Sequence, residues 1–298
     1  MFSFRIAFVL YIFTSLTIFC ESRIFKEFRE NKETSDEECN LPQSVIEDIS
    51  GYQETVEEII EYITKGPYKG RTWKSLAEFV DKFGQRYSGT PELEDAIDYL
   101  IDVFKQNGLE DVSTEDVELP FWQRGLESAV LLKPRRKSLP MLGLGLSIST
   151  PPQGITAEAI VVRNFEELDA LSLEEVAGKI VVFNQPFVSY RETGQYRMWG
   201  ASEAAKKGAV ASLVRSVTPF SLATPHAGIL MYEANVTQIP AASITLEDAE
   251  QLWRMQERGE ELLLTLTMPA KLDMKISRNI YADFKGSSLE KKVVLVAG

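Results

Sequence analysis

Histidine and cysteine are scarce in this chain, which has one His (His226) and two Cys among its 298 residues. No G-x-S-x-G elbow accompanies the histidine, so a serine–histidine–acid triad is not expected. The zinc signatures H-E-x-x-H and C-x-x-C are missing, and "LGLGLS" at Gly143 and Gly145 lacks the third glycine of a dinucleotide-binding loop. We predict no catalytic, cofactor-binding or metal-ligating residue here, and a structural or solvated role for His226.

An excess of basic charge is missing as well. The chain has 32 Lys and Arg against 44 Asp and Glu, which gives a formal net charge of −12. A nucleic-acid-binding face needs positive charge to neutralise phosphates, and docking on an anionic membrane needs it too. The composition therefore argues against both kinds of partner, and solubility explains the acidity.

The amino terminus carries an apolar run, residues 6–20, that is too short for a comfortable membrane span of about 20 residues. One cation, Arg5, precedes this run, and the small residues Cys20 and Ser22 follow it. This pattern is typical of a secretory signal peptide, which we place at residues 1–22; an uncleaved signal anchor is the alternative. We expect a protein that is secreted or held in the lumen of the endoplasmic reticulum or lysosome, without membrane contact after cleavage.

Loss of Cys20 with the signal would leave Cys39 as the single cysteine, so no internal disulfide is expected. Cys39 lies in an acidic segment, residues 23–50, which predicts a leader or pro-segment. Its thiol is either free or paired with another chain. One glycosylation sequon begins at Asn235 in "NVT", and secretion would make it meaningful.

Helical periodicity follows the leader. The stretch "TVEEIIEYIT" predicts a helix whose apolar side packs on the core. Its apolar residues are Val56, Ile59, Ile60 and Ile63. A second helix is predicted at residues 72–83, and a third begins after Thr90, which can cap it, and ends at Asn107 and Gly108.

From about residue 112 the pattern changes to short strands separated by Pro and Gly. "GKIVVFNQPF" predicts a buried strand, "ASEAAKKGAVASLVRS" a helix and then a strand, and "IPAASITLEDAEQL" a strand and then a helix capped by Thr245. Together they predict a mixed β/α unit at residues 125–268. Beyond it, "SRNIYADFKG" and "KKVVLVAG" predict two adjacent strands joined by a turn at "SSLE".

Two charged or aromatic features inside this unit receive structural interpretations first. The acidic pairs Glu166-Glu167 and Glu174-Glu175 predict solvated helix faces. The aromatic-rich stretch "PFVSYRETGQYRMWG" is expected to pack against its surroundings, with the lining of a substrate entrance as the alternative.

Six stretches are informative when they are taken together and in order. They are "FGQRYSGTPELEDAIDYLIDVFKQNGLEDV", "PFWQRGLESAVLL", "LGLGLSISTPPQGITAEAIVV", "GKIVVFNQPF", "YRMWGASEAAKKGAVASLVRSV" and "IPAASITLEDAEQL". They resemble the co-catalytic zinc aminopeptidase and carboxypeptidase family, from about residue 50 to the last residue. The resemblance implies an α/β fold: the opening segment of a zinc-peptidase α/β domain, with an incomplete sheet, and an inserted mixed β/α protease-associated domain.

The resemblance also implies a division of the chain. The expected parts are a signal peptide (1–22), an acidic leader (23–50), the amino-terminal part of the peptidase domain (51–124), the protease-associated domain (125–268) and the start of the peptidase core sheet (269–298).

In this family two zinc ions polarise the scissile carbonyl and activate a bridging water, while a Glu moves the proton. The resemblance implies small peptides as substrates and a homodimer as the assembly. The family's first ligands, His-x-Asp, directly follow a "VVLVxG" strand, and this chain ends at Gly298. We therefore expect the chain alone to bind no zinc and to be inactive.

Only one segment of this chain matches a family motif near the active site. Gly84, Arg86, Ser88 and Gly89 match the pattern Gly-x-Arg-x-Ser-Gly, which the resemblance places near the rim of the catalytic domain. A turn and helix cap is the other interpretation, and it is the simpler one.

Two functions remain open. The chain is either the amino-terminal portion of a secreted zinc-dependent metallocarboxypeptidase, or a complete secreted protein that acts without catalysis as a protease-associated binding or dimer-interfering module. The apolar ending "VVLVAG" favours the first, because an unpaired apolar strand edge invites aggregation.

Overall fold

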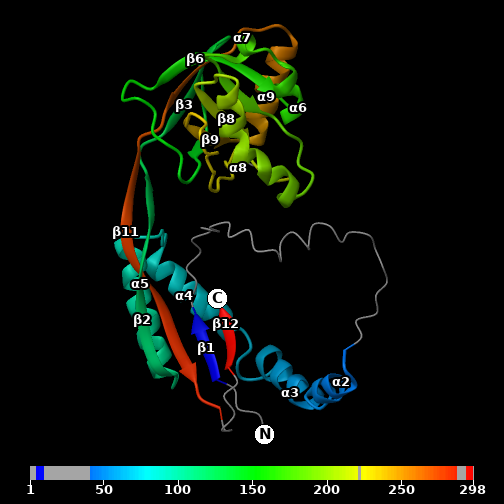
Figure 1. Cartoon of the computed structure of the whole chain (residues 1–298), viewed down its shortest axis with the longest axis vertical. Helices are drawn as coiled ribbons and strands as arrows, with labels where there is room; N and C mark the ends of the chain where they lie inside the picture. The colour runs from blue at the N-terminus through cyan, green and yellow to red at the C-terminus, as the bar shows by residue number, and fades with distance from the viewer. Residues whose placement is uncertain (1–4, 10–40, 221–222, 287–292, 298) are drawn as a thin grey trace. The chain divides into compact units, whose positions relative to one another are not determined.

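The computed structural model describes residues 5–9, 41–220, 223–286 and 293–297. It divides into two compact units: unit 1 comprises Met1–Leu119 and Lys275–Gly298, and unit 2 comprises Pro120–Met274. Helices and strands are mixed along the chain, which confirms the predicted α/β class (Figure 1). The sequence predicts an inserted unit at residues 125–268, whereas unit 2 begins at Pro120 and ends at Met274.

Unit 2 is built on one mixed sheet. In the described part of the chain this sheet has eight strands, in the order β4-β3-β10-β6-β7-β8-β9-β5. The strands are β3 (Ser128–Lys133), β4 (Lys137–Leu139), β5 (Met141–Gly143), β6 (Ile155–Val162), β7 (Ile180–Phe183), β8 (Ala211–Arg215), β9 (Ala241–Ile244) and β10 (Leu263–Thr267). β6, β7, β8 and β9 run parallel to one another, and β10, β3, β4 and β5 are antiparallel to their neighbours.

Helices cover both faces of this sheet. They are α6 (Phe165–Ala170), α7 (Leu173–Val176), α8 (Tyr190–Lys206) and α9 (Leu246–Glu257). Because side chains alternate along a strand, Ile180 and Val182 of β7 join a core with α9, whereas Val181 and Phe183 join a second core with α6, α7 and α8. The apolar run in "GKIVVF" is therefore buried from both sides, as predicted for a parallel strand.

Side-chain caps fix where these helices begin. The Thr245 hydroxyl accepts a hydrogen bond from the Asp248 backbone N–H, which confirms the predicted cap of α9. Asn164 and Ser189 cap α6 and α8 in the same way, and Ser172 forms a capping box with Glu175. The start of α8 differs from expectation, since the helix begins at Tyr190 and includes most of the aromatic-rich stretch.

Unit 1 contains a smaller core. Its elements are β1 (Arg5–Val9), α2 (Gln43–Ser50), α3 (Gln53–Thr64), α4 (Arg71–Phe83), α5 (Pro91–Gln106) and β12 (Val293–Ala297). It also contains most of β2 (Glu110–Arg124) and of β11 (Ala270–Phe284), because the boundary between the units falls inside these two strands. Leu93 and Ile97 of α5 are buried against Ile280 of β11. Next to this core, Arg278 forms ion pairs with Glu94 and Asp98 of α5, at 2.9 and 2.8 Å.

The predicted adjacency of the last two strands is wrong. The four-stranded sheet of the described residues has the order β12-β1-β11-β2, so β1 lies between β11 and β12. β1 is parallel to β12 and antiparallel to β11. The closeness of β11 and β12 in the sequence predicts a hairpin, but β1, from the other end of the chain, pairs with both strands. The predicted "SSLE" turn lies outside the described residues.

The predicted core face of α3 is also wrong. Val56, Ile59, Ile60 and Ile63 are 48–53% exposed, because no described element packs on that face. The last residues of the predicted leader form α2, and the role of residues 23–50 as a leader or pro-segment stays a prediction. The other predictions for the amino terminus, including the fate of Cys20 and Cys39, lie outside the described residues, apart from β1 within the predicted signal peptide.

None of the described helices combines the length and apolar character that a membrane crossing requires.

Candidate functional site

The metal-binding capacity of the chain can be tested on its donor residues. Within the described ranges no three side chains of His, Cys, Asp or Glu are grouped so that they could hold a metal ion. His226 is exposed, its backbone N–H donates to the Ser216 hydroxyl at 2.8 Å, and its ring meets the edge of Tyr190 at 6.0 Å. The residues described here therefore do not fit a zinc centre.

The motif segment before α5 forms a turn. Arg86 lies over the Phe79 ring at 4.8 Å and donates to the Gly84 carbonyl. Gly89 has a φ of 75°, a backbone conformation that favours glycine, and it leads directly into Thr90, whose hydroxyl caps α5. Ser88 lies between these residues. The local geometry has the features of a turn and helix cap, and a role at an active-site rim stays a prediction.

Asn235 of the sequon is exposed in a turn between Met231 and Ile239. Its φ of 65° is left-handed, which Asn adopts more readily than most residues. The side chain is thus accessible to a modifying enzyme, and glycosylation there stays a prediction.

An open hollow of about 660 Å³ lies beside the carboxyl ends of β6 and β7 in unit 2. Its lining comes from the turn after β6, from the segment after β7 and from the first turns of α8: Arg163, Asn164, Phe165, Glu166, Glu167, Gln185, Pro186, Val188, Glu192, Thr193, Gln195 and Tyr196. In open α/β sheets this edge is where ligands commonly bind, because the loops that leave parallel strands meet there. The hollow is therefore a candidate site within the described part of unit 2.

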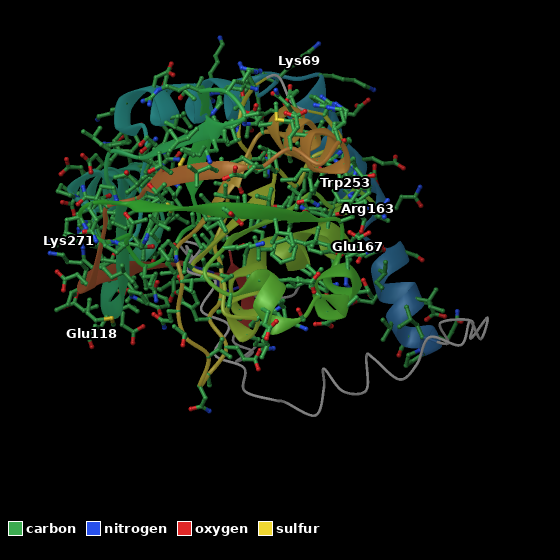
Figure 2. The ribbon with its side chains drawn as sticks, turned by 90° about the horizontal axis from the view of Figure 1, so that it is seen from above. Lys69, Glu118, Arg163, Glu167, Trp253 and Lys271 are labelled. Atoms are coloured by element: carbon green, nitrogen blue, oxygen red, sulfur yellow. The ribbon has the colours of Figure 1, made fainter. Side chains whose placement is uncertain are left out.

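The single cation of the lining is already paired. The Arg163 guanidinium donates to Glu167 at 2.7 Å and lies 4.8 Å over the Trp253 ring; Figure 2 labels all three residues. Burial works to raise the pKa of the Glu167 carboxyl, but hydrogen bonds from the Arg163 side chain and backbone, together with its charge, hold that pKa below its usual value. Arg163 and Glu167 therefore neutralise each other.

The lining of the hollow includes Gln185, a buried amide with an unused acceptor. Gln185 is 1% exposed, and its Nε2 donates to the Arg215 carbonyl at 2.9 Å. Its Oε1 has no hydrogen-bond partner among the described residues. Buried polar atoms are nearly always paired, so an unpaired one beside a hollow indicates a place for a donor.

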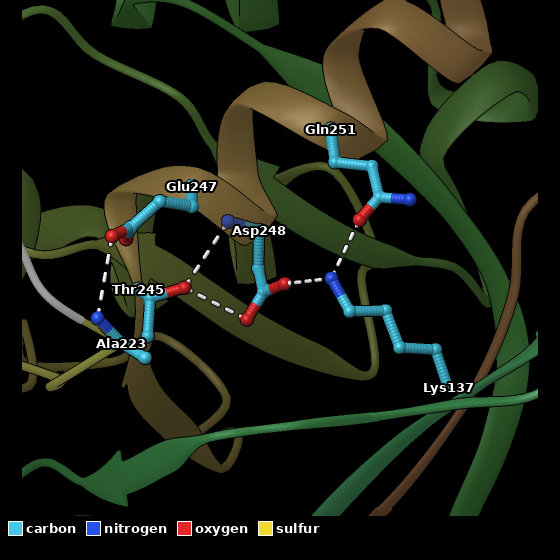
Figure 3. A network of polar contacts seen from close by, with 6 residues as sticks. All are labelled: Lys137, Ala223, Thr245, Glu247, Asp248 and Gln251. Atoms are coloured by element: carbon cyan, nitrogen blue, oxygen red, sulfur yellow. Dashed lines mark hydrogen bonds and ion pairs between the residues drawn. The ribbon is translucent and has the colours of Figure 1, made fainter.

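A second group of buried charges in unit 2 has a structural arrangement. Lys137 of β4 donates to Asp248 and Gln251 of α9, and the Thr245 hydroxyl donates to the other oxygen of Asp248 at 2.7 Å (Figure 3). At the start of the same helix, the Ala223 N–H donates to Glu247. Each oxygen of Asp248 has a partner, so this network ties α9 to β4 and leaves no group free for chemistry.

A third buried charge is less well satisfied. Glu127 accepts from the Gly143 N–H at 2.8 Å and pairs with Arg124 at 3.2 Å, but its Oε1 has no partner among the described residues. Burial raises the pKa of the Glu127 carboxyl, while the Gly143 hydrogen bond and the Arg124 charge act in the opposite direction.

The hollow is not predicted by the sequence patterns. Gln185 lies in "GKIVVFNQPF", which predicts a buried strand, and the acidic pair Glu166-Glu167 predicts a solvated helix face. Glu192 lies in the aromatic-rich stretch that is expected to pack, with the lining of a substrate entrance as the alternative. One signal was present: these residues follow two buried strands separated by helices, so their positions at one sheet edge were foreseeable. The unpaired Oε1 of Gln185 could not be predicted from the sequence.

No protein-family profile matches the chain. Carboxypeptidase Q of Xenopus laevis is 49% identical over 252 residues, which are 84% of this chain and 54% of that protein. The chain thus spans about half the length of the curated relatives it matches.

Among solved structures, a peptidase M28 precursor of Shewanella amazonensis matches 78% of this chain and 54% of its own, with a TM-score of 0.73 and 27% identity. A zinc aminopeptidase of Bacillus subtilis shares the fold over 70% of this chain and 45% of its own, with a TM-score of 0.51 and 21% identity.

Proposed function

This chain is a homologue of carboxypeptidase Q, and we propose that it forms part of a secreted zinc-dependent carboxypeptidase that hydrolyses small peptides. The observation that carries the proposal is 49% identity sustained over 84% of the chain. Such identity over so long a stretch supports a shared reaction class, and the fold shared with a zinc aminopeptidase supports zinc as the cofactor of the complete enzyme.

In this proposal the zinc site of the complete enzyme is formed by residues outside the described part of this chain. A site with two metal ions needs several His and carboxylate ligands that converge from fixed positions. This chain has one His, and the described residues contain no group of three potential ligands. We therefore propose that the chain on its own is catalytically inactive.

The two units would have separate roles in the complete enzyme. We assign unit 1 to the peptidase domain and unit 2 to a protease-associated domain inserted in it. Two observations support this: unit 2 lies in sequence between the two segments of unit 1, and it has its own buried cores. Arg86, Ser88 and Gly89 would then stand near the active-site rim.

Secretion, glycosylation at Asn235 and a homodimeric assembly are further parts of the proposal. The basic start and short apolar run of residues 1–22 support export, and the exposed position of Asn235 supports its modification.

A non-catalytic binding or dimer-interfering role is the second candidate. The open hollow of unit 2 favours it, since this site contains no zinc ligand set and could act without hydrolysis.

The test uses two proteins: the 298-residue chain, and the same chain fused to the part of frog carboxypeptidase Q that the match does not cover. We expect no stoichiometric zinc and no dipeptide turnover in the first, and zinc with chelator-sensitive turnover in the second. Metal content by mass spectrometry and a dipeptide assay measure both. Two zinc ions per 298-residue chain would overturn the assignment of the metal site, and a folded, zinc-loaded fusion without turnover would overturn the peptidase role.

A further inference from the structure

We infer that the hollow beside β6 and β7 binds the basic side chain of a peptide, a lysine ammonium or an arginine guanidinium. The inference concerns unit 2 alone, so it holds whether or not the complete protein hydrolyses peptides. Three properties of the hollow carry it: the charge of its lining, the unused acceptor of Gln185 and an aromatic wall.

The charge of the lining favours a cation. Three glutamates line the hollow, and only Glu167 is neutralised, by Arg163. Glu166, in the first turn of α6, and Glu192, in the first turn of α8, form no ion pair with any described residue. Both carboxylates are exposed, and their negative potential attracts a positive group and repels an acidic one.

The unused acceptor favours a ligand that donates hydrogen bonds. The Gln185 amide is held in place by the bond from its Nε2 to the Arg215 carbonyl, and its Oε1 is buried without a partner among the described residues. Lysine and arginine side chains carry several N–H donors and no acceptor. A neutral apolar side chain would leave Oε1 unpaired, and a carboxylate would face it with another acceptor.

The aromatic wall suits the stem of such a side chain. Phe165 and Tyr196 stack with their ring centroids 4.4 Å apart, and both line the hollow. Burial raises the pKa of the Tyr196 hydroxyl, which keeps that wall uncharged. Long basic side chains place their methylene groups on apolar surfaces while the charged end stays near polar groups, and a cation is attracted to an aromatic face.

The experiment titrates the ¹⁵N-labelled 298-residue protein with capped tripeptides and follows its amide signals by NMR at low salt. The probes are acetyl-Ala-Lys-Ala-amide, the norleucine analogue of the same length without the charge, and the glutamate analogue. We expect the lysine peptide to shift signals of Thr193, Gln195 and the Gln185 side chain, with at least about tenfold tighter binding than the norleucine peptide. Equal binding of the lysine and norleucine peptides, or no shift by the lysine peptide, would overturn the inference.

Cadaverine separates the ammonium group from the peptide that carries it. We expect the lysine peptide to bind more tightly, because its backbone adds contacts at the open mouth. Binding of cadaverine without binding of the lysine peptide would overturn the assignment to a peptide.

Variants locate the site. Glu166→Gln and Glu192→Gln change exposed residues and should each weaken binding of the lysine peptide about threefold, whereas Gln185→Met, which removes the acceptor, should weaken it about tenfold. Glu174→Gln removes an exposed carboxylate from α7, outside the lining, and is the matched control that should leave binding unchanged. Unchanged binding in both surface variants would overturn the inference even if Gln185→Met failed to fold.

Discussion

The two units bury their apolar residues in opposite ways. In unit 2 the central strand β7 is covered on both faces, and Ile180, Val181, Val182 and Phe183 have no exposed surface. In unit 1 the core centres on α5 and β11, and helix α4 presents an apolar face formed by Trp73, Leu76 and Val80 that no described element covers.

This difference shows what an amphipathic pattern can and cannot establish. The apolar residues of α4 lie at intervals of three and four, as they do in a helix that packs on a core. The spacing predicts that the helix has one apolar face. It does not predict which segment covers that face, because the covering surface is not encoded in the helix itself.

The largest expected effect is a loss of stability when a fully buried side chain of unit 2 is removed. Phe183→Ala removes a fully buried ring that meets the edge of Phe165 at 5.5 Å, and it leaves a cavity between the sheet and α8. The free energy of unfolding should fall by about 3–5 kcal/mol. Urea unfolding followed by tryptophan fluorescence measures it.

The matched control is Phe220→Ala, a ring that is 73% exposed, which should change stability by no more than about 0.5 kcal/mol. A similar loss in both variants would show that burial does not decide the effect.

Much of unit 2 was predictable from the sequence because its signals are local. The buried run of β7 and the Thr245 cap of α9 depend on residues close together in the chain. In each of these elements a local signal, an apolar run or a capping residue, predicts the same structure that the tertiary fold requires.

What could not be predicted depends on pairing over long distances. β12 and β11 are close in sequence, yet β1 lies between them, and no local pattern specifies such an insertion. The hollow also depends on distant residues. The sequence gives the residue types of its lining, but it does not give the hydrogen bond from Gln185 to the Arg215 carbonyl, thirty residues away, or the unpaired Oε1 that remains.

The second prediction concerns the buried charge of unit 2. In Asp248→Asn the ion pair with Lys137 is lost, and the Thr245 hydroxyl loses a charged acceptor. Lys137 is partly exposed and can turn to solvent, so we expect a loss of about 2 kcal/mol, below the value for a fully buried pair. A double-mutant cycle with Lys137→Met should give a clear coupling energy. The exposed pair Lys133–Glu261 is the control, and a coupling there as large as in the buried pair would contradict the argument.

The third prediction tests Glu127, a carboxylate of unit 2 whose pKa is raised by burial. Because the folded state holds the Glu127 proton more tightly than the unfolded state does, the free energy of unfolding should fall as pH rises from 4.5, the usual value, through the higher folded pKa. The effect is modest, since Arg124 and the Gly143 N–H oppose it. Urea unfolding between about pH 4 and 7 should show this decline in the wild type and in Glu174→Gln, and a weaker decline in Glu127→Gln. Equal slopes in all three would rule out Glu127 as the cause.

The smallest expected effect is the loss of stability in Trp73→Ala, which tests whether the apolar face of α4 in unit 1 is exposed. Trp73 is 72% exposed, so Trp73→Ala removes few contacts within the chain and should change the free energy of unfolding by no more than about 0.5 kcal/mol. Ile97→Ala in the core of the same unit should cost about 2–5 kcal/mol, because that side chain is buried between α5 and β11. Circular dichroism during urea unfolding measures both without relying on the altered tryptophan. Trp73→Ala should also reduce binding of a dye specific for exposed apolar surface. A loss for Trp73→Ala as large as that for Ile97→Ala would mean that the face of α4 is covered in solution, and the contrast between the two units would then fail.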